Sequence, residues 1–230
     1  MTLSVKAKRL LRIKQHPPLA LASVLVAISG PALANGPTST LYFTSTTYSP
    51  TNFLVFGGTT TAIGTPQRLA PLNLTQESAI AVFGGRIATS QYDSTMGSVY
   101  DANFTYVSGL TTSMAGENWD IFDGTTDGKF NYGIQYGSGD IKVFNTGWGG
   151  TPTLLFTATG ASPTGIAYDP LNNSLWTSDY NDGTVRDYSM GGTLLYSFQN
   201  GYSQGLALAY DPADNTLWML TQWGTGNFAQ

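Results

Sequence analysis

Short apolar segments separated by turn sequences are the dominant pattern of this chain. Between residues 165 and 198, the turns are Asp-Pro-Leu-Asn-Asn (169–173), Asn-Asp-Gly (181–183) and Met-Gly-Gly (190–192). Proline presets φ, and Asn and Gly accept positive φ, so each of these sequences favours a tight reversal. The pattern predicts strands at 165–168, 174–178, 184–188 and 193–198, and after residue 34 no segment has a sustained helical period.

This pattern recurs along the chain with a period of 42 residues. Residues 169–176 (Asp-Pro-Leu-Asn-Asn-Ser-Leu-Trp) return as 211–218 (Asp-Pro-Ala-Asp-Asn-Thr-Leu-Trp), and a Gly-Gly pair at 149–150 returns at 191–192. Fainter copies lie upstream, where Ile-Ala-Val at 80–82 precedes Ile-Ala-Tyr by 86 residues, or about two periods. Four strands in about 42 residues match the length of one propeller blade.

The sequence therefore predicts an all-β protein, a β-propeller of four-stranded blades of about 42 residues. We expect about four to five blades, with the strongest copies at 123–164 and 165–206 and a partial copy at 207–230. Since that copy stops within its third strand, we expect a propeller that is incomplete at the C-terminus. The alternative is a β-sandwich, which has similar strands and turns but needs no internal repeat.

Residues 1–34 have the composition of a secretory signal peptide. Five basic residues between Lys6 and Lys14 precede an apolar run at 19–28, and Ala32 and Ala34 form an A-x-A cleavage box. The apolar run is shorter than the roughly 20 residues that a membrane span needs. We expect cleavage after Ala34, a mature chain of residues 35–230 without a membrane span, and a location that is extracellular, periplasmic or at the cell surface.

Removal of the signal leaves an acidic chain with a narrow chemical repertoire. Five basic residues then face fourteen acidic ones, a net charge of −9, which disfavours nucleic acid as a partner. The single histidine, His16, leaves with the signal, and the chain has no cysteine. These absences exclude Ser-His-Asp and Cys-His nucleophiles and the ordinary zinc sites from the mature chain, so we expect that it is not an enzyme.

The repeats resemble the NHL-like and gluconolactonase-like propeller repeats of bacterial exported proteins. The resemblance lies in the cadence Gly-Ile-Ala-Tyr-Asp-Pro (165–170), Asn-Ser-Leu-Trp (173–176), Gly-Thr-Val (183–185) and Leu-Leu-Tyr-Ser-Phe (194–198). With residues 119–128, it also looks like exported proteins of PEP-CTERM type, although their C-terminal sorting tail is absent. It implies a propeller and not an activity, because propellers host enzymes, receptors and scaffolds alike.

The enzymatic relatives in these families do not match this chain at their functional residues. Gluconolactonase-like enzymes hold a metal in the central channel through acidic and Asn ligands, whereas the only glutamates here are Glu77 and Glu117. Streptogramin-lyase-like propellers rely on histidine, which the mature chain lacks. The resemblance therefore carries neither activity over to this sequence.

Two sets of residues are candidates for binding. Trp119, Trp148 and Trp223 lie outside the repeated tryptophan position, which Trp176 and Trp218 share and where we expect packing between blades. If exposed, these three side chains suit stacking on sugar rings, with ordinary packing as the alternative.

The second set comprises Asp123 and Asp127, in the segment Asp-Gly-Thr-Thr-Asp-Gly (123–128), which has the look of a calcium loop. The middle acid and the closing Glu of such a loop are missing, so a Gly-rich turn is the alternative. Carboxylates without His or Cys favour hard cations, and calcium is the one cofactor that the sequence suggests.

Two functions follow from these observations. The first is an exported, non-catalytic propeller that binds a glycan or a protein as a binding or scaffold module. The second is a calcium-dependent hydrolase or lactonase, which needs carboxylates from different blades to converge on the central channel.

Overall fold

A computed structural model describes residues 40–45, 52–57, 68–71, 73–74, 77–91, 94–111, 121–212, 215–221 and 228–229. The predicted signal peptide and its cleavage box at Ala32 and Ala34 lie outside these residues, as do Trp119 and Trp223. Within the described part of the chain, no helix has the length and apolar character needed to cross a membrane.

The described strands form five antiparallel sheets, each a meander of consecutive strands. Blade 1 has β1 (Thr40–Ser45), β2 (Asn52–Gly57) and β3 (Arg68–Pro71), and blade 2 has β4 (Glu77–Phe83), β5 (Arg86–Gln91), β6 (Met96–Asp101) and β7 (Tyr106–Thr111). Blade 3 has β8 (Ile121–Thr126), β9 (Phe130–Gln135), β10 (Asp140–Asn145) and β11 (Gly149–Thr157). Blade 4 has β12 (Pro163–Asp169), β13 (Ser174–Asp179), β14 (Thr184–Ser189) and β15 (Leu194–Gln199), and blade 5 has β16 (Leu208–Asp211), β17 (Thr216–Leu220) and β18 (Phe228–Ala229).

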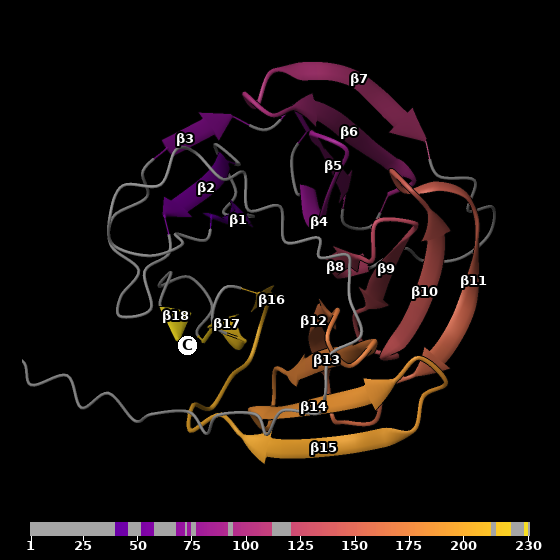
Figure 1. The fold of residues 1–230 in the computed structure, drawn as a ribbon, viewed down its shortest axis with the longest axis vertical. Helices are drawn as coiled ribbons and strands as arrows, with labels where there is room; N and C mark the ends of the chain where they lie inside the picture. Colours follow the sequence, from indigo (N-terminus) through magenta and orange to yellow (C-terminus); the bar gives the residue numbers. More distant parts are fainter. Residues whose placement is uncertain are drawn as a thin grey trace, which may run out of the picture.

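The sheets are arranged like a fan around a common centre (Figure 1). The first strands of successive blades are neighbours, β4 of β8, β8 of β12 and β12 of β16, and the last strands β7, β11 and β15 lie at the rim. This radial arrangement confirms the predicted β-propeller, and the predicted strands at 165–168, 174–178, 184–188 and 193–198 are each found as a strand in blade 4. The β-sandwich alternative is wrong, because the sheets do not pair as two facing layers.

A repeated aspartate lies at the turn that follows the first strand of blades 3, 4 and 5. In blade 4, Asp169 Oδ1 accepts hydrogen bonds from the backbone N–H groups of Leu171 and Asn172 at 2.8 and 3.3 Å, and Asn173 closes the turn with a φ of 50°. The other carboxylate oxygen faces the indole N–H of Trp176, as Asp211 faces that of Trp218. The 42-residue signature is thus a turn joined to a buried tryptophan.

The core consists of the contacts between successive blades. Trp176 packs with residues of blade 5 in one apolar cluster, which confirms the packing expected for the repeated tryptophan. Between blades 2 and 3 the register position of Trp176 holds only Ala88, and Trp148 from blade 3 lies in the same cluster instead. The Trp148 indole N–H donates to the Ala88 carbonyl at 3.1 Å, and its ring packs edge-on against Phe144.

Close packing around Trp148 requires glycine at position 124. A Cβ built on Gly124 would overlap the Trp148 ring, whereas a Cβ on Gly191 would meet nothing closer than the Ser189 hydroxyl at 3.8 Å. We therefore expect Gly124→Ala to lower the free energy of unfolding by about 1–3 kcal/mol, the usual cost of overpacking. Gly191→Ala, the control, should change it by less than about 0.5 kcal/mol. Urea unfolding of the two variants measures this difference, and equal midpoints would contradict it.

Candidate functional site

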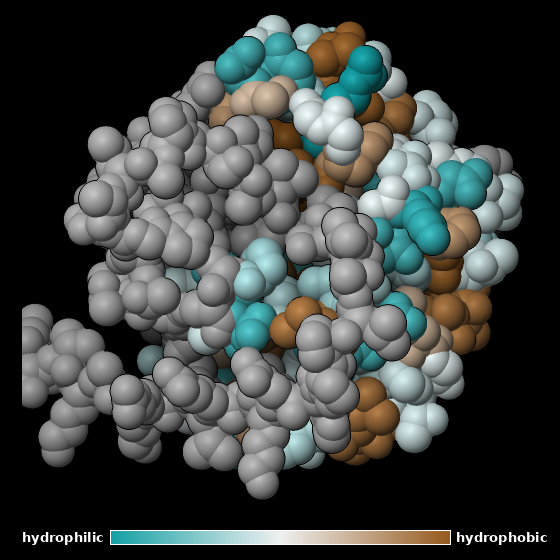
Figure 2. All heavy atoms as spheres, viewed as in Figure 1, coloured by the Kyte–Doolittle hydropathy of each residue, from teal (hydrophilic) through white to brown (hydrophobic). Residues whose placement is uncertain are grey.

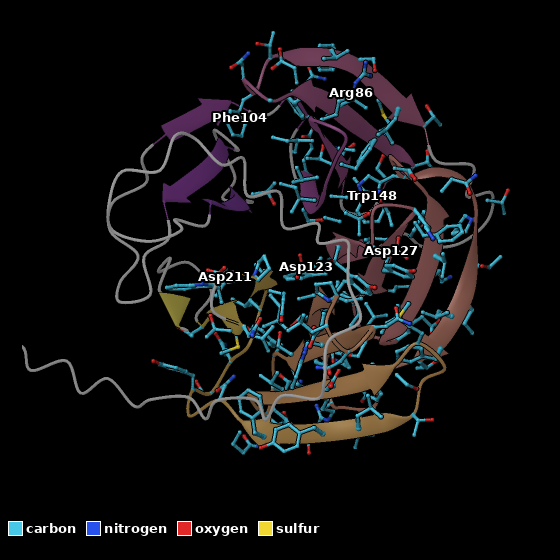
Figure 3. The ribbon with its side chains drawn as sticks, viewed as in Figure 1. Arg86, Phe104, Asp123, Asp127, Trp148 and Asp211 are labelled. Atoms are coloured by element: carbon cyan, nitrogen blue, oxygen red, sulfur yellow. The ribbon has the colours of Figure 1, made fainter. Side chains whose placement is uncertain are left out.

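Near the centre of the fan, the carboxylate of Asp123 on β8 bonds to the first strands of two further blades. Figure 3 shows Asp123 near the middle of the ring, with Asp127 and Trp148 farther out. Asp123 Oδ2 accepts hydrogen bonds from the backbone N–H groups of Ile166 on β12 and Leu208 on β16, each at 2.9 Å. Its Oδ1 accepts the N–H of Gly124, also at 2.9 Å. One side chain therefore joins the first strands of blades 3, 4 and 5.

The three donors are equivalent positions of the repeat. Gly124, Ile166 and Leu208 are spaced by 42 residues, so the ring geometry brings the same N–H group of three blades toward one point. A register shift precedes this position in both β8 and β12, between Ile121 and Asp123 and between Pro163 and Gly165. Bulges of this kind change the direction of the backbone locally, which helps a backbone N–H group to point toward Asp123.

Among the described copies of blades 2 to 5, blade 3 alone supplies the acceptor. The position of Asp123 is occupied by Ala79 in blade 2, by Gly165 in blade 4 and by Ala207 before blade 5. The sequence pattern alone did not single out this role, because a carboxylate at a position that is small elsewhere is no part of the repeat. An alignment of the repeat copies would have indicated this role, because Asp123 stands where the other copies have Ala or Gly.

Burial controls the ionisation of Asp123. Desolvation of the fully buried carboxyl raises its pKa to about 7, although the N–H groups of Ile166, Leu208 and Gly124 act in the opposite direction. The native state therefore binds the proton more tightly than the unfolded chain does. The stability that this group contributes is complete below pH 4 and is lost as the pH rises toward about 7.

The structure does not bring Asp123 and Asp127 together as calcium ligands. Residues 121–126 form β8, so the predicted calcium loop is mostly a strand, and four residues of strand separate the two by roughly 13 Å. Asp127 is the repeated turn aspartate of blade 3, and it accepts hydrogen bonds from the N–H groups of Lys129 and Phe130 and from the Tyr132 hydroxyl. Among the described residues, no three His, Cys, Asp or Glu side chains are grouped to hold a metal ion.

The predicted role of Trp148 as a ligand platform is wrong. The side chain is completely buried between blades 2 and 3, and its N–H is used by Ala88, so neither its face nor its edge is available to a ligand. Its unusual φ of 64° turns the indole inward after the tight turn between β10 and β11. Sequence spacing could not reveal the burial of Trp148, because the space that its ring fills depends on the small residue Ala88 in blade 2.

The buried Asp187 carboxyl on β14 has an unpaired oxygen. The residue is 6% exposed, and its Oδ1 has no hydrogen-bond partner; the nearby Ser174 hydroxyl does not come within hydrogen-bonding geometry of an acceptor. Burial raises the pKa of Asp187 to about 6, the proximity of the Ser174 hydroxyl lowers it in part, and the Asp169 carboxylate raises it further. In the register, Asp187 faces Trp176, and the corresponding residues of blades 2 and 3 are Val99 and Val143.

Asp179 and Asp182, which neighbour Asp187 in the sequence, have structural partners. Asp179 is fully buried and accepts the N–H groups of Asn181 and Ser162, so that it closes its own turn and fixes the segment before β12. Asp182 is paired with Arg186 at 3.1 Å. The Asp179–Asp187 hairpin therefore holds one unsatisfied carboxyl and no converging pair.

Comparison with known proteins shows the fold and no family. No family model matches the chain, and no curated protein does. Among solved structures, a chain of the nidogen/laminin complex is similar, with a TM-score of 0.55 and 14% identity, over 79% of this chain and 70% of that one. The streptogramin B lyase structure has a TM-score of 0.49 and 16% identity, over 69% of this chain and 55% of that one. At these identities the likeness concerns the propeller architecture alone.

Replacement of Asp123 tests its role as the link between three blades. Asp123→Ala leaves three buried N–H groups without an acceptor, so we expect a loss of about 3 kcal/mol or more in the free energy of unfolding. Asp182→Ala is the control, since it removes a partly exposed ion pair worth less than about 1 kcal/mol. Urea unfolding of the full chain measures both. An Asp123→Ala variant as stable as the control would contradict the assignment.

Replacement of Asp187 should have the opposite effect. Asp187→Val installs the residue that blades 2 and 3 have at this register position, and we expect a gain of about 1 kcal/mol or more at pH 7, because a buried unpaired polar group is removed. The raised pKa of Asp187 makes the wild type lose stability between pH 4 and pH 6, so the gain should shrink on acidification through that range. Thermal melts from pH 4 to pH 7 measure it, and a gain that does not vary with pH would count against this account.

Proposed function

We propose that this chain is an exported, non-catalytic β-propeller that serves as a binding or scaffold module outside the cytoplasm. The observation that carries the proposal is a division between interior and rim. The described carboxylates nearest the centre hold blades and turns together, whereas the last strands of the blades present apolar side chains to solvent. The first arrangement builds a rigid support and the second offers a surface for a partner.

Export is proposed from the N-terminal sequence. The basic segment, the apolar run at 19–28 and the cleavage box at Ala32 and Ala34 are the three parts of a secretory signal. The resemblance to exported bacterial propellers of PEP-CTERM type agrees with this location. A cell-surface, periplasmic or extracellular position would also suit an acidic chain without cysteine, whose stability rests on its core.

The rim of blade 4 is the clearest candidate surface for a protein partner. On β15, Leu194, Leu195 and Tyr196 are each about half exposed, and among the described strands β15 pairs only with β14. Figure 2 shows apolar residues along the rim of the fan, where β11 and β15 lie. β15 has neither a charged residue nor a proline, the usual protections of an edge strand, and contiguous exposed apolar residues are typical of interaction sites.

Binding of a protein is also consistent with the structural neighbour, which was solved as a complex of nidogen with laminin. The alternative, a calcium-dependent hydrolase or lactonase, needs carboxylates of several blades to converge on the channel. Asp123 reaches the centre, but its two oxygens accept backbone N–H groups from three blades. The described residues therefore favour the binding role.

A protein microarray tests the binding role directly. We expect the full chain to bind at least one protein saturably, and the double variant Leu195→Lys/Tyr196→Lys to weaken that binding tenfold or more, because central apolar anchors dominate interface energies. Leu171→Lys, which changes a single exposed leucine in a turn of the same blade, is the matched control and should bind as the wild type does.

A parallel screen of lactones and esters, with calcium and with a chelator, addresses the enzymatic alternative. Turnover that needs calcium, together with a melting temperature that rises with the metal, would overturn the non-catalytic proposal. Equal binding by the Leu195→Lys/Tyr196→Lys variant would remove β15 as the surface.

A further inference from the structure

Tyrosines occur in the described turns at one end of the propeller and not at the other. The turns Tyr-Gly-Ser-Gly (136–139) and Tyr-Asn-Asp-Gly (180–183) follow the second strands of blades 3 and 4, and Asn-Gly-Tyr-Ser-Gln (200–204) follows the last strand of blade 4. The described turns at the opposite end, such as 127–129, 170–173 and 190–193, have no tyrosine. We call the first end the tyrosine end.

Two of these tyrosines occupy the same position of the repeat. Tyr136 follows Gln135, the partner of Ile121 at the start of β8, and Tyr180 follows Asp179, the partner of Pro163 at the start of β12. The sequence has a third copy in Tyr92 after Gln91, which lies outside the described residues. A tyrosine at this turn is therefore a feature of successive blades.

The three turns belong to one continuous surface. The Gly139 carbonyl accepts the N–H of Ala158, and the Ser162 carbonyl accepts that of Tyr180, so the turns of blades 3 and 4 are joined through the segment between them. The Gly183 carbonyl accepts the N–H of Asn200 in the loop that carries Tyr202. These hydrogen bonds fix the backbone next to each tyrosine, so less conformational entropy is lost when a ligand binds.

The aromatic rings of this end are accessible. Tyr136 is 39% exposed and Tyr202 is 50% exposed, while Tyr180 is partly buried. The Tyr136 ring is supported by Phe122 of β8, at a centroid distance of 5.8 Å and an interplanar angle of 32°. A supported, half-exposed ring presents one face to solvent, which is the geometry that stacking on a ligand needs.

The polar groups between these rings are hydroxyls, amides and carboxylates. Ser138 and Asn181 are exposed, and Asp182 is paired with Arg186 at 3.1 Å, so the two turns carry no unpaired positive charge. Such groups hydrogen-bond well to sugar hydroxyls and repel anions. The large exposed aliphatic side chains, which a protein partner would need, lie mainly on the outer strands, as Leu154 and Leu195 do.

From this placement we propose that the tyrosine end binds a neutral glycan, with Tyr136 and Tyr180 stacking on successive sugar rings and Tyr202 at the margin. The inference rests on the proposed role as a binding module and assigns it a second surface, distinct from the rim strand β15. The sequence candidates for sugar stacking were tryptophans; of these Trp148 is buried, and the site proposed here is made of repeated tyrosines.

Affinity electrophoresis tests the glycan site. Native gels that contain dextran, laminarin or xyloglucan serve as neutral probes, and gels with alginate serve as the anionic control. We expect retardation of the full chain by at least one neutral polysaccharide and none by alginate. Tyr136→Ser/Tyr180→Ser should weaken this binding about threefold to tenfold for each ring removed. The matched control is Tyr106→Ser, which changes a tyrosine of similar exposure on β7.

Each outcome decides the matter. If the serine variant melts early, Tyr136→Leu/Tyr180→Leu replaces it, since leucine keeps apolar bulk without a ring face and should lose retardation, whereas Tyr136→Phe/Tyr180→Phe keeps the rings and should preserve it. No retardation in any neutral gel, retardation by alginate alone, or equal loss in Tyr106→Ser would overturn the glycan site. Protein binding through β15, measured on the microarray, would then still stand, so failure of this inference and failure of the proposed function are distinguishable.

Discussion

The convergence of three backbone amides on the Asp123 carboxylate is the interaction on which the rest of the structure depends. A propeller must hold its first strands together at the point where side chains have least room, and in blades 3 to 5 one acidic residue and three N–H groups of the repeat contribute this link. Ionic attraction is not the source of the link, because its donors are uncharged amides and burial disfavours the charged form.

Around that link, blades 3 to 5 share an aspartate turn, whereas the side chains packed between neighbouring blades differ. The Asp169 and Asp211 turns return with their tryptophans, whereas blade 2 has Ala88 at this register position and receives Trp148 from its neighbour. Asp187 also departs from the other blades, because it places a carboxyl where blades 2 and 3 have valine. Exposed apolar and aromatic side chains lie at the rim and in the turns at one end, and these are the surfaces to which we assign the proposed binding role.

Much of this fold could be predicted from the sequence, because turns and periods are local. Asp-Pro-Leu-Asn-Asn before Leu175 and Trp176 specifies a strand, a turn and a strand within a dozen residues. The site could not be predicted in the same way. Whether Trp148 faces solvent depends on a residue 60 positions earlier, and the partners of Asp123 lie as far as 85 positions away. The calcium-loop interpretation of 123–128 was wrong in its secondary structure because burial, not glycine content, made that segment a strand.

The presence of Asp123 in one blade and not in its neighbours bears on how such a repeat protein arises and how it can be redesigned. Duplication gives every blade the same backbone donor, but symmetry cannot supply a single shared acceptor, since three carboxylates at one axis would repel one another. The copies differ at that position, which is Asp123 in blade 3 and Ala79, Gly165 and Ala207 in the copies of blades 2, 4 and 5. An idealised protein made from the average repeat would therefore have the turns and the tryptophans but lack the Asp123 link. The blades of this chain are not equivalent, and one cannot replace another.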